Sequence, residues 1–320
     1  TTDAELAEAT ARGLDAVAKR SWRGFWLTLR ARVVVVTHGY GDVNRYGTSG
    51  AFVVQLWHGI PLKKLHLDSP ATLKVRGVPD HRYVRALLAR AYRFAGRGIG
   101  LFPVASELVA PRIASAFGVR PERIPATGDI RDDALLGRDG AEVRADARML
   151  LADAAGPIDD ATRVVLYAPT WRDGAPDPGA PTGEEWRMIA RWLEARDAVL
   201  LVRAHPLGLG DYAAGPGVSD RIRMLGSAEL VDVTPALAGV DALVTDYSSI
   251  AYDYALTDGP MVFFAPDVEV YARKRGLYEN YRTFSDDRYV TRWQHVLEHL
   301  DAIGTDTELG RRIARHTVWL

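Results

Sequence analysis

The chain has 320 residues, which is enough for two domains or for one large α/β domain. Its formal net charge of −1 gives no indication of nucleic-acid binding, and the absence of cysteine excludes disulfides, a thiolate nucleophile and cysteine-ligated zinc. The sequence holds no run of 18 apolar residues, as a membrane-spanning helix requires.

The first part of the chain alternates between helical and strand patterns. Residues 4–20 predict a polar helix, the valine-rich run 33–37 predicts a buried strand, and 51–56 predict a second strand. Polar loops follow both strands, at 38–44 and 57–61, and loops at the carboxyl ends of parallel strands meet at one crevice. Because such a domain usually opens on a strand and this one opens on a helix, we expect that its native N-terminal part is missing.

Residues 81–98 predict a helix in which arginines alternate with aliphatic and aromatic residues, with no acidic residue between them. One interpretation is a surface helix whose arginine stems lie over the core. The other is a helix that lies on an anionic membrane surface. The pattern itself leaves both interpretations open.

The second part of the chain repeats the alternation. A polar, small-residue-rich segment at 137–156 separates the two blocks. Further strands are predicted at 163–167, 198–202, 242–244 and 261–265. Strands that alternate with helices in two blocks indicate two parallel, doubly wound sheets. We therefore predict an α/β protein with two Rossmann-like domains, 1–138 and 139–320, that face a cleft as in GT-B-type glycosyltransferases. The first strands lack a G-x-G-x-x-G, which disfavours a dinucleotide oxidoreductase.

The stretch 242–256 predicts a strand that turns directly into a helix. Asp246, Ser248 and Ser249 are common N-cap residue types, and apolar residues recur at helical spacing from Ile250 onward. Such a turn directs backbone N–H groups and two hydroxyls to the positive end of a helix dipole, which suits a phosphate. Asp253 lies one turn inside the helix, on the side facing the same mouth. An ordinary serine cap is the alternative interpretation.

Polar clusters follow the predicted strands at 57–59, 129–131, 169–172, 203–205 and 248–249. Together they suit the transfer of a phosphate-linked group. Arg131 and Arg203 are candidates for bidentate contacts to phosphate oxygens. One histidine would take a proton from an attacking hydroxyl and the other would stabilise charge on the phosphate, although a lone loop histidine is more often structural. No carboxylate pair has an obvious metal geometry, so we predict no metal and no cofactor.

Four motifs, in order, resemble those of the CDP-glycerol glycerophosphotransferase family, the teichoic acid primases and polymerases. They are Gln55–Lys64 (QLWHGIPLKK), Tyr167–Arg172 (YAPTWR), Arg203–Pro206 (RAHP), and Thr245–Ser249 (TDYSS) with Asp253. The resemblance implies a two-domain fold with CDP-glycerol in the cleft. It also implies transfer of glycerol phosphate, or ribitol phosphate, to a hydroxyl of a lipid-linked acceptor with release of CMP.

The resemblance also implies roles for single residues. His58 is the expected general base, and His205 is expected to contact phosphate and to act in catalysis. The expected substrate-binding residues are Trp57, Gly59, Ile60, Pro61, Arg131, Pro169, Thr170, Arg203, Ala204, Ser248, Ser249 and Asp253. Ile60 stands where the family usually has threonine, and 128–133 (GDIRDD) replaces its Gly-x-Pro-Arg-Asn-Asp segment. Both changes bear on which polyol phosphate is transferred.

The resemblance finally implies a location and partners. The family acts at the cytoplasmic face of the plasma membrane, so we expect a peripheral protein that contacts anionic lipid through residues 81–98 and binds no nucleic acid. Two other hypotheses remain open. One is a nucleotide-sugar glycosyltransferase for capsule or wall polymer, and the other is an inactive nucleotide-binding scaffold. The sequence indicates neither the acceptor nor the oligomeric state.

Overall fold

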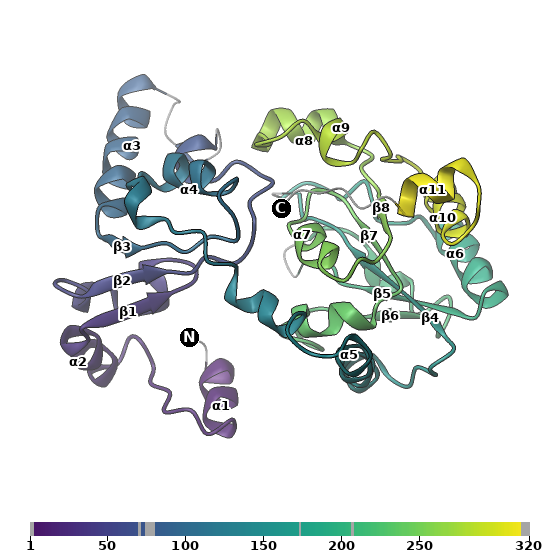
Figure 1. The fold of residues 1–320 in the computed structure, drawn as a ribbon, viewed down its shortest axis with the longest axis horizontal. Helices are drawn as coiled ribbons and strands as arrows, with labels where there is room; N and C mark the ends of the chain where they lie inside the picture. Colours follow the sequence, from purple (N-terminus) through teal and green to yellow (C-terminus); the bar gives the residue numbers. More distant parts are fainter. Residues whose placement is uncertain (1–2, 70–71, 74–80, 173, 206–207, 315–320) are drawn as a thin grey trace. The chain divides into compact units, whose positions relative to one another are not determined.

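The computed structural model describes residues 3–69, 72–73, 81–172, 174–205 and 208–314. Two compact units divide the chain, Thr1–Asp129 and Ile130–Trp319 (Figure 1). The division precedes the predicted boundary at 138/139, because η5 (Ile130–Ala134) contacts η7 (Thr234–Gly239) of the second unit.

The first unit is built on a three-stranded parallel sheet in the order β1-β2-β3. Its strands are β1 (Val33–Val36), β2 (Phe52–Gln55) and β3 (Ile99–Leu101). Val34, Val36 and Val53 form a small buried core, whereas Val33 and Val35 are 55% and 54% exposed. The predicted burial of strand 33–37 is therefore wrong for one face. Side chains alternate along a strand, and only one face of β1 is covered.

Helices and single turns complete the first unit. They are α1 (Asp3–Ala11), α2 (Trp22–Arg30), η1 (Tyr40–Asp42), η2 (Arg45–Gly47), η3 (His66–Asp68), α3 (Arg82–Gly96), α4 (Ala110–Phe117) and η4 (Pro121–Arg123). The single helix predicted over 4–20 is wrong, because Gly13 takes a left-handed φ of 74° and the chain leaves the helix there. A new helix, α2, begins after Ser21, whose hydroxyl accepts the N–H of Gly24 at 3.0 Å. The helix predicted over 81–98 is confirmed.

The second unit holds a five-stranded parallel sheet in the order β6-β5-β4-β7-β8. The strands are β4 (Arg163–Ala168), β5 (Ala198–Val202), β6 (Ile222–Met224), β7 (Ala242–Thr245) and β8 (Met261–Phe263). The four predicted strands are confirmed. The short strand β6 (IRM) was not predicted because a run of three residues shows no period. The chain runs outward from β4 to β6 and returns to the other side of β4 as β7, so the strand order reverses between β4 and β7.

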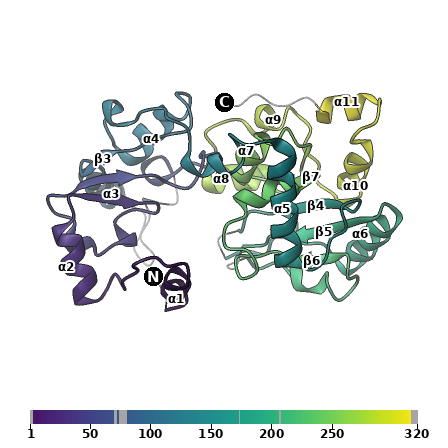
Figure 2. The same cartoon turned by 60° about the horizontal axis from the view of Figure 1, so that its bottom comes forward.

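Helices cover both faces of this sheet, with α6 and α10 on one side and α5 and α7 on the other (Figures 1 and 2). The helices and turns are α5 (Gly140–Ala155), α6 (Gly183–Ala195), η6 (Tyr212–Ala214), η7, α7 (Ile250–Ala255), α8 (Val268–Arg275), α9 (Tyr281–Phe284), α10 (Trp293–Ala302) and α11 (Glu308–Ala314). Asp241 ties α5 to the sheet by accepting hydrogen bonds from Arg144, Arg148 and the N–H of Val164, at 2.6, 2.6 and 2.7 Å. No helix within the described ranges is long and apolar enough to cross a membrane.

Candidate functional site

The strongest candidate site in the second unit lies where its strand order reverses. Ligands of open parallel sheets bind outside the carboxyl ends of the strands, at such a reversal. The loop after β4 carries Pro169 and Thr170, and the turn after β7 carries Ser248 and Ser249. The structure therefore brings two of the predicted clusters to one edge of one sheet.

The buried residue Asp246 joins the loop after β4 to the turn after β7. Its buried carboxylate accepts the backbone N–H groups of Thr170, at 2.9 Å, and of Tyr247, at 2.6 Å. Its own carbonyl accepts the hydroxyl of Tyr281 at 2.9 Å. A carboxylate held by backbone donors on two loops fixes their spacing, so Asp246 acts on the loops rather than as an N-cap of α7.

Arg172 neutralises this carboxylate. The Arg172 guanidinium lies 2.9 Å from Asp246, makes a two-pronged contact of 2.8 and 3.0 Å with Asp267 before α8, and also donates to the carbonyl of Thr170. Burial alone would lower the pKa of Arg172, but the surrounding carboxylates raise it overall. Burial raises the pKa of Asp246, and the charge of Arg172 opposes that rise.

Two tyrosine rings pack against the charged cluster of Arg172, Asp246 and Asp267. Tyr247 and Tyr271 stack at 4.1 Å, and the guanidinium carbon of Arg172 lies 5.0 Å from the centroid of each ring. The Tyr247 hydroxyl donates to Asp267 at 3.0 Å, and burial raises the pKa of Tyr247. Sequence reasoning quoted Arg172 within a motif but gave it no role. Its signal was its place at the end of the strand-end motif YAPTWR, whereas its partners Asp246 and Asp267 lie some 75 to 95 residues further along the chain.

The Ser248–Ser249 turn opens a short helix, as predicted. The hydroxyl of Ser248 accepts the N–H of Ile250 at 3.4 Å, while Ser249 occupies the N-cap without a capping hydrogen bond from its side chain. Both residues are half-buried. The prediction that they bind phosphate stays a prediction.

Arg131 and Asp253 meet each other in the second unit. A guanidinium nitrogen of Arg131, in η5, donates to the carboxylate of Asp253, which is buried in α7. Sequence reasoning predicted a substrate contact for each residue and did not predict this pair. The pair fixes η5 against α7 beside the serine turn.

Arg203 and His205 follow β5. The Arg203 guanidinium donates to the carbonyls of Leu225, Leu230 and Val231, at 3.0, 2.9 and 3.2 Å, and so holds the loop after β6. Its predicted phosphate contact therefore stays a prediction, and the structure gives it a positioning role. His205 is exposed and stacks on Trp171 at 5.4 Å. Ala204 packs against the hydrophobic core, and Pro206 lies outside the described residues.

His58 lies at the corresponding edge of the first unit, after β2. The preceding residue, Trp57, takes a left-handed φ of 62°, which is uncommon for a large side chain, and His58 is exposed at the turn. The imidazole stacks on His38 at 4.5 Å and contacts Trp57 at 4.0 Å. His38 follows β1, and its N–H donates to Asp42 at 2.7 Å. The prediction that loops 38–44 and 57–61 meet is confirmed within this unit.

The other predicted residues of the loop after β2 are less exposed than His58. Ile60 and Pro61 are buried, and the Pro61 carbonyl accepts a hydrogen bond from Arg112 of α4 at 3.1 Å. Gly59 is half-buried. The structure therefore gives Ile60 and Pro61 a part in anchoring the loop, while their predicted contact with substrate stays a prediction.

Comparisons with known proteins match the whole chain to one family. A family model described as CDP-glycerol:poly(glycerophosphate) glycerophosphotransferase matches residues 1–317. The teichoic acid ribitol-phosphate polymerase TarK of Staphylococcus aureus is 29% identical over 252 residues, which cover 78% of this chain and 45% of that protein. The teichoic acid glycerol-phosphate transferase of the same organism is 27% identical over 286 residues, covering 83% and 65%. The chain spans about half the length of the curated relatives it matches.

A solved structure supports the fold. A variant of the wall teichoic acid polymerase TagF superposes with a TM-score of 0.71 at 22% identity, covering 94% of this chain and 70% of that chain. At this identity the likeness shows the fold alone, a mixed α/β fold with parallel sheets.

We predict that Arg172→Met lowers the free energy of unfolding by about 3–5 kcal/mol at pH 7, because it leaves Asp246 and Asp267 without their buried cation. Urea unfolding measures the loss. Arg282→Met is the matched control: its exposed pair with Asp287 is expected to contribute less than about 1 kcal/mol.

The loss of unfolding free energy in Arg172→Met should also depend on pH. Burial raises the pKa of Asp246 above its unfolded value of about 3.9, and removal of Arg172 raises it further. The charged carboxyl then destabilises the fold above its folded pKa, and protonation relieves this as pH falls through that value. The difference between wild type and Arg172→Met should therefore narrow as pH falls from 7 toward the unfolded pKa of about 3.9. A constant difference would contradict the assignment.

Proposed function

The chain belongs to the CDP-glycerol:poly(glycerophosphate) glycerophosphotransferase family, and we propose that it transfers glycerol phosphate, or a related polyol phosphate, from a CDP-linked donor to a hydroxyl of a lipid-linked acceptor. The observation that carries the proposal is the reversal of strand order in the second unit. There the Thr170 loop and the Ser248–Ser249 turn are locked together by Asp246 and Arg172. Backbone N–H groups at such an edge suit a diphosphate.

In the proposed reaction the acceptor hydroxyl oxygen attacks the phosphorus that bears the polyol. A new P–O bond forms to the acceptor, the P–O bond to the cytidine phosphate breaks, and CMP leaves. His58 takes the hydroxyl proton as general base. Its ring is exposed, and its stacking on His38 and Trp57 limits how the imidazole can turn.

The donor side is assigned to the second unit. We propose that Ser248 and Ser249 hold the phosphates, with His205 beside them, and that Pro169 and Thr170 line the nucleotide pocket. The stack of His205 on Trp171 gives the exposed imidazole a defined position next to the loop after β4. Arginine side chains and backbone N–H groups can stabilise a diphosphate without a metal ion, so we expect turnover in the presence of EDTA to equal turnover without it.

The arrangement of the units is part of the same proposal. Each unit has a parallel sheet whose polar loops gather at the carboxyl edge. We propose that the units act as the acceptor-side and donor-side domains of a GT-B-type enzyme, with His58 on one and the diphosphate on the other. The donor-side domain begins near Ile130.

We also propose that α3 makes this a peripheral protein of the cytoplasmic membrane face. The buried residues of α3 are Ala89 and Gly96, where the helix passes close to α4. On the opposite side Tyr83, Leu87 and Phe94 are 65%, 69% and 75% exposed, so they do not cover the core. Exposed apolar residues among arginines are typical of a helix that lies in an anionic interface.

His58→Asn tests the assignment of the base. We expect turnover, measured as CMP release, to fall about 10²- to 10⁴-fold while the affinity for CDP-glycerol stays within twofold, because general-base catalysis contributes a factor of this size. His295→Asn, an exposed histidine of α10, is the control. Wild-type turnover in His58→Asn would reject the role.

Calorimetry tests the donor. The full chain should bind CDP-glycerol or CDP-ribitol and should bind UDP-glucose more weakly. Tight binding and turnover of UDP-glucose, without turnover of a CDP-polyol, would replace the proposal with sugar transfer. Binding of CDP-polyols without turnover for any acceptor would indicate a scaffold.

Vesicle binding tests the membrane contact. Replacing Arg85, Arg90 and Arg93 of α3 with glutamine should weaken binding to phosphatidylglycerol vesicles by about 100-fold, at about 1 kcal/mol for each arginine. The matched control replaces Arg187, Arg191 and Arg282 of the second unit with glutamine. Equal binding by the two triple variants would contradict a membrane role for α3.

A further inference from the structure

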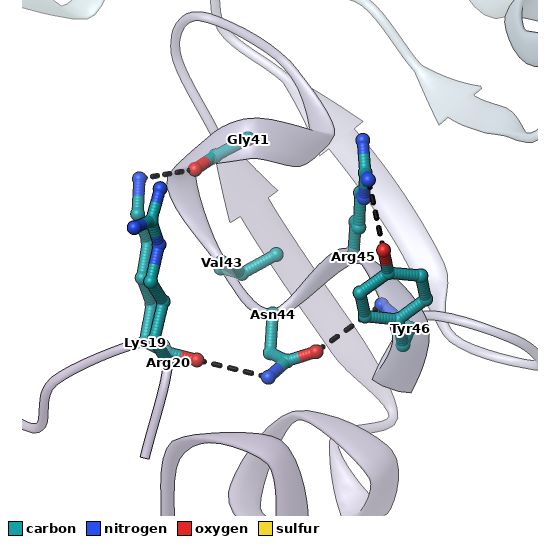
Figure 3. A pocket seen from close by; sticks show the side chains of 7 residues that line it. All are labelled: Lys19, Arg20, Gly41, Val43, Asn44, Arg45 and Tyr46. Carbon is teal, nitrogen blue, oxygen red and sulfur yellow. Dashed lines mark hydrogen bonds between the residues drawn. The ribbon is translucent and has the colours of Figure 1, made fainter.

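A polar cavity lies in the first unit, and neither His38 nor His58 lines it. Its volume is about 610 Å³, and it is lined by Lys19, Arg20, Gly41, Val43, Asn44, Arg45 and Tyr46. Figure 3 shows Lys19 and Arg20 on one side, Arg45 and Tyr46 on the other, and Val43 and Asn44 between them. A cavity of this size accommodates a small ligand or one repeat of a polymer.

Hydrogen bonds hold the two sides of the cavity together. Lys19 donates to the carbonyl of Gly41, and the amide of Asn44 donates to the carbonyl of Lys19 at 3.0 Å. The side-chain oxygen of Asn44 accepts the N–H of Tyr46 at 3.2 Å. These contacts fix the segment before α2 against the loop after β1, so the cavity is preformed.

The charge of the cavity is one-sided. Three cations line it, and its described lining holds no carboxylate. The nearby Asp42 is occupied with the N–H groups of Thr37 and His38, each at 2.7 Å. Three like charges around one space repel one another, and an anion bound between them relieves that repulsion.

The exposed side chains offer suitable donors for such an anion. Arg20 and Arg45 are exposed, and the Arg45 guanidinium lies 4.9 Å from the ring centroid of Tyr46 and donates to its hydroxyl at 2.8 Å. This contact holds the guanidinium in place on the wall of the cavity. Arginine forks match the oxygens of a phosphate in a bidentate manner.

The cavity and the proposed base share one loop. The loop after β1 carries His38, which stacks on His58 at 4.5 Å, and continues through η1 and η2 into the cavity wall. An anion held there lies on the same unit as the group that would activate the acceptor hydroxyl, and the loop after β1 connects the two sites.

We propose that this cavity binds phosphodiester groups of the acceptor chain, next to the terminal hydroxyl that receives the new unit. The inference rests on the proposed function and deepens it, because it assigns the acceptor chain a site on the first unit. An acceptor that already carries polyol phosphate is then preferred to an uncharged glycan. The donor diphosphate has no part in this site.

The test uses the full chain with Arg20→Gln and Arg45→Gln combined. The matched control combines Arg32→Gln and Arg120→Gln, two exposed arginines of the same unit that do not line the cavity. Calorimetry with a soluble glycerol phosphate tetramer, without donor, should show binding weakened about tenfold or more in the cavity variant and unchanged in the control. Thermal unfolding of both variants should match wild type.

Kinetics separate the acceptor site from the donor site. In the cavity variant we expect the KM for the tetramer to rise about tenfold, while the KM for CDP-glycerol and turnover of an uncharged acceptor stay within twofold. Equal tetramer binding and KM in both double variants would overturn the inference while leaving the proposed function intact. Loss of binding to phosphatidylglycerol vesicles, with tetramer binding retained, would overturn it in favour of a lipid headgroup site.

One further outcome distinguishes the two proposals. If the wild-type chain releases no CMP from any CDP-polyol but its tetramer binding still depends on Arg20 and Arg45, the proposed function fails and the anion site stands.

Discussion

The buried contact between Asp246 and Arg172 is the interaction on which the candidate donor site depends. It joins the loop after β4, the turn after β7 and the segment before α8, three parts of the chain that a parallel sheet alone would leave independent. Removing two charges from water is costly, and the cost is offset only when the remaining hydrogen-bonding atoms are satisfied. Here backbone N–H groups satisfy Asp246, and Asp267 and the carbonyl of Thr170 satisfy Arg172.

Much of the architecture could be predicted from the sequence because buried parallel strands read as short apolar runs. β4, β5 and β7 were predicted in this way, and they place the candidate loops at one edge. The helix over 4–20 was wrong because Gly13 interrupts a pattern that is polar on all sides. The outer face of β1 was predicted as buried because four valines carry no information about which face is covered.

The site itself was harder to predict because its long side chains have several possible partners. Arg131, Arg172 and Arg203 all follow strand-end motifs, yet the structure pairs the first with Asp253, surrounds the second with carboxylates, and directs the third to backbone carbonyls. Spacing along a sequence identifies which loop carries an arginine. It does not identify which group, some 25 to 120 residues away, its guanidinium meets.

Under the proposed function, the second unit would hold the donor phosphates and the first would activate the acceptor hydroxyl. The identity of the nucleotide product tests the proposed transfer most directly, because attack on phosphorus releases CMP and attack on carbon releases CDP. Phosphorus NMR of the full chain with CDP-glycerol and a glycerol phosphate acceptor should show CMP and new phosphodiester formed in equal amounts. Release of CDP, with no new phosphodiester, would contradict the account.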